Sequence, residues 1–314
     1  MLLDRRLLFV TGKGGVGKTT VAAALAMLAA QQGKRTLVCD VDARGDVAAA
    51  YETQPLSFDA RQIQPGLHGM VMDTEASLRE YLKIHLRIPL IGRIGPLARS
   101  FDFVATAAPG VKEILTVGKL AYEVREDNYD LVVVDAPASG HIVGQLAAPS
   151  AIRELVQVGP VRSQTGWMLD LLTDPAVTGA VAVASPEEMP VTETLELIER
   201  LDTETHVSVA AVIVNRVLPE LFGHREEEIF EALVDLVESD GDARDLIGVG
   251  ADKVIAGAQL AVRLRRTRAE HIARLRVGLP AGLAVINLPY LFARAHGVRT
   301  TRKLAEALAD ELGY

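Results

Sequence analysis

The chain has 314 residues, a formal net charge of −8 and 49% hydrophobic residues, which is enough for one large α/β domain with a well-buried core. The acidic balance argues against sequence-independent nucleic-acid binding, which needs a cationic face, so we expect no nucleic-acid partner. A single cysteine, Cys39, excludes an internal disulfide and is typical of a cytoplasmic protein. No stretch is apolar and long enough for a secretory signal or an intrinsic membrane span, so any membrane role would act through a partner.

The predicted elements begin with a short buried strand at 6–11, an Ala- and Leu-rich helix from Lys18 to Gln32, and a second strand at 35–40. Further strands are predicted at 129–137, 179–185, 208–215 and 283–290, and further helices at 190–204, 225–239 and 299–312. The strands are nearly all apolar instead of alternating, which is typical of strands buried on both faces. The repetition of strand and helix therefore predicts a doubly wound, mostly parallel α/β fold.

A long segment between the second and third strands does not follow this alternation. Apolar residues recur at helical spacing at Leu78, Tyr81, Leu82 and Leu86, and again at Val111, Ile114, Leu115 and Tyr122. We expect a helical insertion at about 70–128. Its apolar residues either form the core of the insertion or line an exposed groove that marks a partner or ligand site. Trp167, the only tryptophan in the sequence, has two similar interpretations: it packs in the core or it belongs to a hydrophobic surface that binds a client.

A phosphate-binding loop follows the first strand. The stretch "GKGGVGKTT" matches G-x-x-x-x-G-K-[ST] and lies between a predicted strand and a predicted helix, as the motif requires. Its backbone N–H groups can surround phosphate oxygens, and the helix amino end adds partial positive charge. We expect Lys18 to pair with the β- and γ-phosphates and the Thr19 hydroxyl to ligate Mg²⁺. The nucleotide-binding candidates are Gly12, Gly14, Gly15, Val16, Gly17, Lys18, Thr19 and Thr20.

Carboxylates end two of the predicted strands. Asp135 closes the apolar run "LVVVD", which is a Walker B arrangement, so we expect Asp135 to hold Mg²⁺ together with Thr19. Asp42 follows the second strand, at the edge of the sheet that faces the ligand crevice, whereas Asp40 and Asp46 could be turn residues. We therefore predict a single P-loop ATPase domain over 1–314 that binds its nucleotide with Mg²⁺. ATP or ADP is favoured over GTP because no Asn/Thr-Lys-x-Asp guanine motif appears in the predicted strands.

The segment "APASGH" after Asp135 can move as a unit because it contains a proline, small residues and a glycine. The Gly140 N–H could sense the γ-phosphate. His141 either transmits the nucleotide state or is simply packed or solvated.

A second lysine, Lys13, gives the loop the pattern "KGGVGKT", which resembles the deviant Walker A class. In that class this lysine reaches across a two-fold interface, so the resemblance implies a nucleotide-sandwich dimer in which Lys13 stabilises charge on the partner's nucleotide. Within its own chain we expect Lys13 to point into solvent, and a merely exposed lysine is the alternative. The class also places a water-orienting aspartate at Asp42. The catalytic candidates are accordingly Asp42, Lys13 and Lys18.

The loop, Asp42 and "DAPASGH" together resemble the ArsA family, which includes the arsenite-pump ATPase and the ATPase that delivers tail-anchored membrane proteins. The layout is most similar to the short actinobacterial ArsA-like proteins. The resemblance extends to the "VTETLELIERL" helix with Glu193 and Thr194. It also implies that Asn215 in "VIVNR" contacts adenine and that Pro289 in "NLPYL" belongs to a second adenine-side loop.

The chain departs from these relatives in several ways. One cysteine cannot build a thiolate site for arsenite, and the Cys-x-x-Cys zinc clamp is missing. The arsenite pump has two ATPase halves in one chain and this chain has one, so we expect a homodimer, or a heterodimer with a second ArsA-like subunit. A membrane-protein client is one candidate cargo. The stretch "DARGD" differs from the family's usual first switch, which keeps a weakly hydrolysing regulatory subunit as an alternative.

A second alternative is a partitioning or positioning ATPase of the deviant Walker A class. Such a protein needs a DNA-binding basic surface or a membrane-binding terminal helix. The basic run at 262–276 is better interpreted as a solvated helix face paired with the acidic helix at 225–239. The C-terminal residues 299–314 lack large apolar anchors. An electron-transfer iron protein is excluded, because it needs paired cluster cysteines.

Overall fold

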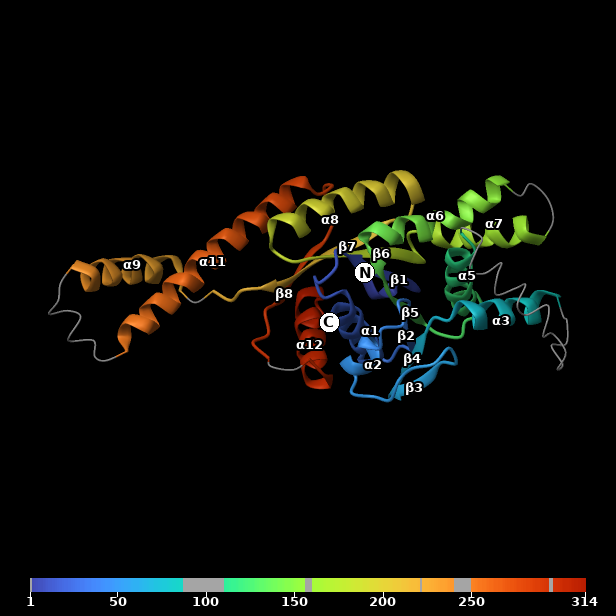
Figure 1. The fold of residues 1–314 in the computed structure, drawn as a ribbon, viewed down its shortest axis with the longest axis horizontal. Coiled ribbons are helices and arrows are strands. Elements are labelled where there is room, and N and C mark those ends of the chain that lie inside the picture. Colours follow the sequence, from blue (N-terminus) through green and yellow to red (C-terminus); the bar gives the residue numbers. More distant parts are fainter. Residues whose placement is uncertain (1, 87–109, 156–159, 221, 240–249, 294–295) are drawn as a thin grey trace.

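A computed structural model describes residues 2–86, 110–155, 160–220, 222–239, 250–293 and 296–314 (Figure 1). Within these residues, eight strands form one sheet in the order β3-β4-β2-β5-β1-β6-β7-β8. All neighbouring strands are parallel except the antiparallel pair β3–β4, which confirms the predicted doubly wound, mostly parallel α/β fold. The strands are β1 (Leu7–Gly12), β2 (Thr36–Asp40), β3 (Arg61–Gln64), β4 (Leu67–Val71), β5 (Leu131–Ala138), β6 (Thr178–Ala184), β7 (Val209–Val217) and β8 (Val285–Pro289).

Helices cover both faces of the sheet. They are α1 (Lys18–Gln31), α2 (Asp46–Ala50), α3 (Thr74–Leu86), α5 (Val111–Arg125), α6 (Ser139–Leu155), α7 (Pro160–Thr173), α8 (Glu188–Arg200), α9 (His224–Ser239), α11 (Ala251–Gly278) and α12 (Val298–Leu312). The apolar side chains of α1, α2 and α12 share one core with one face of the sheet, and those of α5, α6 and α8 pack on the opposite face.

The strands are apolar throughout because both of their faces are buried. In β1, Leu8 and Val10 belong to the core beneath α1, while Leu7 and Phe9 belong to the core beneath α5 and α6. Helix α1 is buried from Val21 to Ala29, and it packs against both the sheet and α12. Its small alanine side chains suit this position, because a helix that is enclosed on several sides needs no polar face.

Several elements differ from the sequence prediction. The β3–β4 pair and the helices α6 and α7 were not predicted. The strand expected at 129–137 spans Leu131–Ala138, and the helix expected at 190–204 ends at Arg200 and continues as a π-helical turn, Leu201–Thr205. In the region expected to hold the insertion, β4 extends to Val71, α3 and α5 are helical as predicted, and residues 87–109 lie outside the described part.

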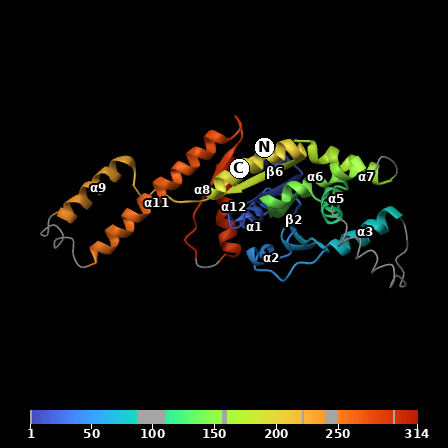
Figure 2. The same cartoon turned by 45° about the horizontal axis from the view of Figure 1, so that its top comes forward.

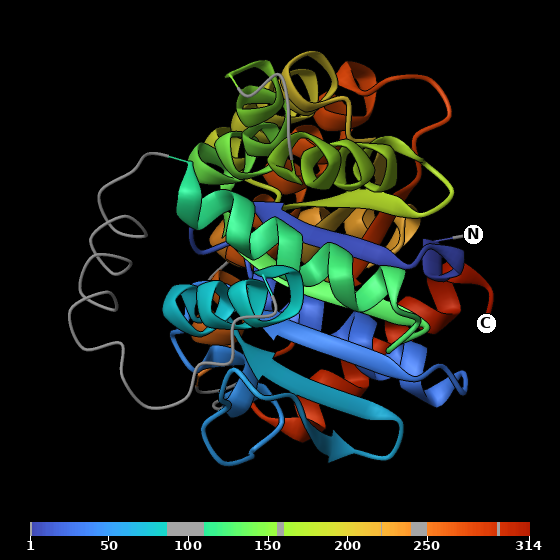
Figure 3. The same cartoon turned by 90° about the vertical axis from the view of Figure 1, so that its right-hand side faces the viewer.

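Four helices gather at one end of the molecule. Figure 3 shows α3 beside α5 in front of the sheet, and α5 also packs against α6 and α7. None of the described helices combines the length and the apolar character needed to cross a bilayer.

At the opposite end, α9 and α11 extend away from the sheet as a pair (Figures 1 and 2). The Arg266 guanidinium contacts Glu227 at 3.1 Å and Glu231 at 2.6 Å, so the predicted pairing of the basic and acidic helices is confirmed. The base of α11 lies against α8, where the Arg274 guanidinium donates to the Thr192 hydroxyl at 2.6 Å.

Candidate nucleotide site

The phosphate-binding loop connects β1 to α1 and is shaped by glycines that lie against neighbouring strands. Gly12 has φ 151°, and a Cβ there would be 2.2 Å from the Val183 carbonyl oxygen of β6. Gly17 has φ 95°, and its Cβ would be 2.4 Å from the Asn215 Nδ2 atom at the end of β7. Only glycine fits both positions. The predicted strand–loop–helix context of the motif is therefore present.

The amino end of α1 is open toward the loop. Gly17 occupies the N-cap position, and no side chain caps the first turn, so its N–H groups can bind an anion. Gly14 and Gly15 are exposed at the crest of the loop, Val16 is buried beneath it, and Thr20 lies in the first turn of α1.

Lys18, Thr19 and Asp135 come together at this point. The Thr19 hydroxyl donates to Asp135 Oδ2 at 2.6 Å, while the buried Asp135 Oδ1 has no hydrogen-bond partner among the described residues. Burial raises the pKa of Asp135 to about 7, the nearby Asp40 and Asp42 carboxylates add to this, and Thr19 and Lys18 oppose it. Burial lowers the pKa of Lys18, although Asp135 and Asp42 oppose that shift.

This donor set fits Mg²⁺. The ion prefers oxygen ligands and is commonly held by one or two carboxylates together with phosphate and water. A buried carboxylate oxygen without a partner, next to a threonine hydroxyl, is the arrangement such an ion would complete. A cation would also relieve the repulsion among Asp135, Asp40 and Asp42.

The two aspartates after β2 differ in their surroundings. Asp40 is buried and accepts hydrogen bonds from the N–H groups of Ala43 at 2.9 Å and Gly45 at 3.2 Å. Asp40 therefore holds the turn, which the sequence analysis gave as one of its possible roles. Asp42 is exposed and forms an ion pair with Arg44 at 3.6 Å. The sequence analysis did not single out Arg44, although it stands only two positions from Asp42.

Lys13 does not point freely into solvent, contrary to the expectation for its own chain. Its ammonium forms an ion pair with Glu193 of α8, and the two side chains are only 30% and 29% exposed. Glu193 had been noted for the family resemblance of its helix, not as a partner of Lys13. No local pattern could reveal the pair, because the two residues are far apart in sequence and meet only when α8 packs beside the loop.

The two adenine-side candidates lie at the ends of adjacent strands. Asn215 is buried, and its Nδ2 donates to the Val16 carbonyl at 2.8 Å while its Oδ1 accepts the Arg216 N–H at 2.9 Å. Asn215 therefore holds the phosphate-binding loop. Pro289 is exposed at the end of β8 and pairs with Val217.

The segment after Asp135 is a direct strand-to-helix junction. Strand β5 continues to Ala138 and α6 begins at Ser139, which places Gly140 and the exposed His141 in the first turn of α6. The Thr11 hydroxyl of β1 donates to the Pro137 carbonyl at 2.9 Å, so the junction is tied to the strand that leads into the loop.

Comparisons with known proteins show the family to which the chain belongs. The model of the anion-transporting ATPase family, ArsA, matches residues 5–170 and 161–233. The chain is 34% identical over 257 residues to the ATPase BagA of Mycobacterium tuberculosis, a match covering 78% of this chain and 74% of that protein. It is 26% identical to the ATPase ASNA1 homolog of Entamoeba dispar (67% of this chain, 76% of that protein) and 29% identical to the ATPase get3 of Neurospora crassa (54% and 51%). The chain therefore belongs to the ArsA family of anion-transporting ATPases and is an ATPase.

Proposed function

We propose that the chain binds ATP with Mg²⁺ at the phosphate-binding loop and hydrolyses it as one half of a dimer. The observation that carries the proposal is the contact between Thr19 and Asp135, which leaves one buried carboxylate oxygen without a hydrogen-bond partner among the described residues. This oxygen lies beside the amino end of α1, which has no side-chain cap. Mg²⁺, when bound, would neutralise charge on the phosphates. The loop N–H groups and Lys18 would hold the phosphates, and Thr19 with Asp135 would hold the metal.

Asp42 is the proposed water-orienting residue. Its carboxylate is exposed at the carboxyl end of β2, where it can accept a hydrogen bond from a water molecule. Arg44 competes for the same carboxylate, so its ion pair with Asp42 would have to open before Asp42 could act.

Lys13 is proposed to act on the partner's nucleotide. Its ion pair with Glu193 would hold the lysine within its own chain until a second subunit, either another copy or another ArsA-like protein, brings a nucleotide within reach. Closing and opening of the dimer would couple hydrolysis to a cargo, for which a membrane-protein client is one candidate.

The metal and phosphate roles can be tested by binding of a fluorescent ATP analogue with and without Mg²⁺. We expect Lys18→Ala to weaken binding in both conditions and Thr19→Ala to remove most of the Mg²⁺-dependent gain. For the water-orienting role, Asp42→Asn should lower phosphate release while leaving binding intact, and Asp46→Asn, the same change four residues later, is the matched control. Equal loss of phosphate release in both variants would refute the role of Asp42.

The dimer role can be tested with Lys13→Ala. This variant should abolish nucleotide-dependent association while weakening nucleotide binding much less, because the lysine would serve the partner's site. The opposite pattern would refute the role across the interface.

A weakly hydrolysing regulatory subunit is the second candidate function, and the ion pair between Arg44 and Asp42 favours it. Arg44→Ala frees Asp42. If the pair restrains the enzyme, this variant should release phosphate faster than the unmodified chain. The regulatory assignment would be refuted if the unmodified chain released phosphate at a high rate without a partner subunit and Arg44→Ala did not change that rate.

A further inference from the structure

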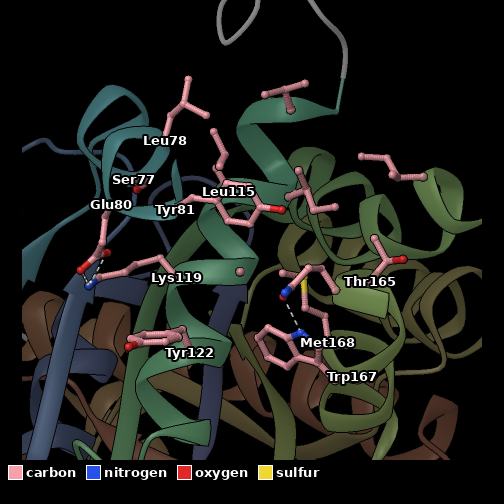
Figure 4. Close-up of a pocket in the computed structure, with 15 residues that line it drawn as sticks. Ser77, Leu78, Glu80, Tyr81, Leu115, Lys119, Tyr122, Thr165, Trp167 and Met168 are labelled. Carbon is pink, nitrogen blue, oxygen red and sulfur yellow. Dashed lines mark hydrogen bonds and ion pairs between the residues drawn. The ribbon is translucent and has the colours of Figure 1, made fainter. Parts of the chain in front are cut away.

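A pocket of about 420 Å³ lies among α3, α5, α6 and α7, and none of its lining residues belongs to the phosphate-binding loop. Figure 4 shows side chains from α3, such as Leu78 and Tyr81, on one side of α5 and Trp167 and Met168 of α7 on the other. The volume is in the range of sites for single small molecules, about 300–1,000 Å³. The walls are mainly hydrocarbon and aromatic side chains, among them Leu78, Tyr81, Leu115, Trp167 and Met168.

The charged groups of the wall are paired with one another. The Lys119 ammonium contacts Glu80 at 2.7 Å (Figure 4). It also contacts Glu123 at 2.7 Å, and the Lys119 side chain is only 10% exposed. Two carboxylates around one ammonium leave a net negative charge. An anionic ligand group would therefore meet repulsion here and find no free cation among the described lining residues.

The indole ring of Trp167 in the pocket wall is held by polar contacts within the protein, one of them to the lining residue Gln164. The Trp167 indole N–H donates to Gln164 Oε1 at 2.7 Å, and the Arg125 guanidinium lies over the ring at 4.8 Å from its centre. Both contacts satisfy the polar part of the indole within the protein. The rest of the ring remains as apolar wall.

A glycine in the middle of α5 helps to open the pocket. Glycine inside a helix lowers helix stability, and Gly118 occupies such a position within Val111–Arg125. A Cβ at Gly118 would lie 2.9 Å from the Met168 methyl carbon, so the missing side chain provides the space that Met168 and the pocket share.

We propose that this pocket binds a small, uncharged hydrophobic molecule of the long-chain alcohol class, with its hydrocarbon chain inside and its neutral head toward solvent. The paired charges disfavour an acid, and the apolar walls favour a chain. A flexible chain can follow walls contributed by four helices. A membrane-spanning helix of about 20 residues is about 30 Å long and 10 Å across, which far exceeds this volume.

Trp167 gives a direct assay, because it is the only tryptophan in the chain and lies in the wall. The probe is 10-bromo-1-decanol, whose bromine quenches tryptophan emission only on contact. We expect saturable quenching that 1-decanol reverses, and weaker binding of decanoate, which carries the same chain with a charged head. Binding of the fluorescent ATP analogue in the same samples keeps this result separate from the nucleotide site.

Two pocket variants and one matched control locate the binding. Gly118→Leu fills the space, its Cβ would meet only the flexible end of Met168, and leucine favours the helix, so we expect at least a tenfold rise in the probe's dissociation constant. Leu115→Gln should cause about a tenfold rise, the factor for lost contact with roughly two methylene groups. Leu260→Gln makes the same change on an exposed face of α11, and we expect no effect.

The absence of saturable quenching would overturn the proposal. So would quenching that survives both pocket variants, because the probe would then bind elsewhere. Tighter binding of decanoate than of 1-decanol would refute the neutral head, and binding of an apolar helical peptide without binding of 1-decanol would assign the pocket to a membrane segment instead.

Discussion

The ion pair between Lys13 and Glu193 predicts that weakening it strengthens dimer formation. Glu193→Gln removes the negative charge with little change of shape. With side chains 30% and 29% exposed, the pair contributes about 1 kcal/mol, the upper end for partly solvated ion pairs. If Lys13 must leave Glu193 to reach a partner's nucleotide, the variant should lower the dissociation constant about fivefold for each lysine that moves.

The size of the effect distinguishes the two kinds of dimer. Both lysines move in a homodimer, so the dissociation constant should fall about 25-fold. In a heterodimer to which only this chain supplies a lysine, it should fall about fivefold. Sedimentation velocity with a non-hydrolysable ATP analogue and Mg²⁺ measures this constant for the chain alone and for the chain with a candidate partner.

Glu196→Gln is the matched control, because it makes the same change at an exposed position of the same helix. The advantage of Glu193→Gln should shrink at high salt, which screens partly exposed charges. If Glu193→Gln dimerises no better than Glu196→Gln, the idea that Lys13 is held back within its own chain is wrong.

Three further predictions concern the loop, the metal carboxylate and the projecting helices. Gly17→Ala should lower the melting temperature by several degrees and abolish nucleotide binding, because residue 17 has a φ of 95° and its Cβ would lie 2.4 Å from Asn215. Calorimetry measures the first effect and binding of the ATP analogue measures the second. The pKa of Asp135 rises on folding from 3.8 to about 7, so this carboxyl group lowers the stability of the folded chain as pH rises through that interval. Urea unfolding without nucleotide and Mg²⁺ should therefore give Asp135→Asn the same free energy of unfolding as the unmodified chain near pH 4. At pH 8 the value for the variant should be higher by up to about 4 kcal/mol. Equal pH dependence of the two proteins would contradict the raised pKa. Arg266→Ala should speed amide hydrogen exchange in α9 while leaving global unfolding unchanged, and a lowered global transition would show that the helix pair supports the core.

Local physical rules were enough to predict the loop and every strand of the sheet except β3 and β4. Strands such as β1 and β5 lie between two helical layers, so both of their faces must be apolar, and the sequence records this directly. The loop was equally clear, because its glycines, Lys18 and Thr19 are adjacent in the chain. The contact between Thr19 and Asp135 agrees with the metal role assigned to both residues, which stays a prediction.

Elements and contacts that depend on packing were not predictable. Helix α6 contains Gly144 and Pro149, which interrupt the helical pattern, and β3 and β4 are short strands with polar residues. Glu193 gains its partner only when α8 packs beside the loop. The two open interpretations of Trp167 also needed the fold, because α7 places that residue in the wall of a pocket that helices from separate parts of the chain create.

Neighbouring residues of α8 face two different parts of the molecule. Glu193 holds the lysine of the loop, and the adjacent Thr192 accepts a hydrogen bond from Arg274 near the base of α11. Helix α11 has 28 residues and is therefore about 42 Å long, so a tilt of about 5° at its base would displace its far end by about 4 Å. A small shift of α8 on release of Lys13 would therefore move the far end of α11 by several times as much, and a protein bound at that end would lose or gain contacts.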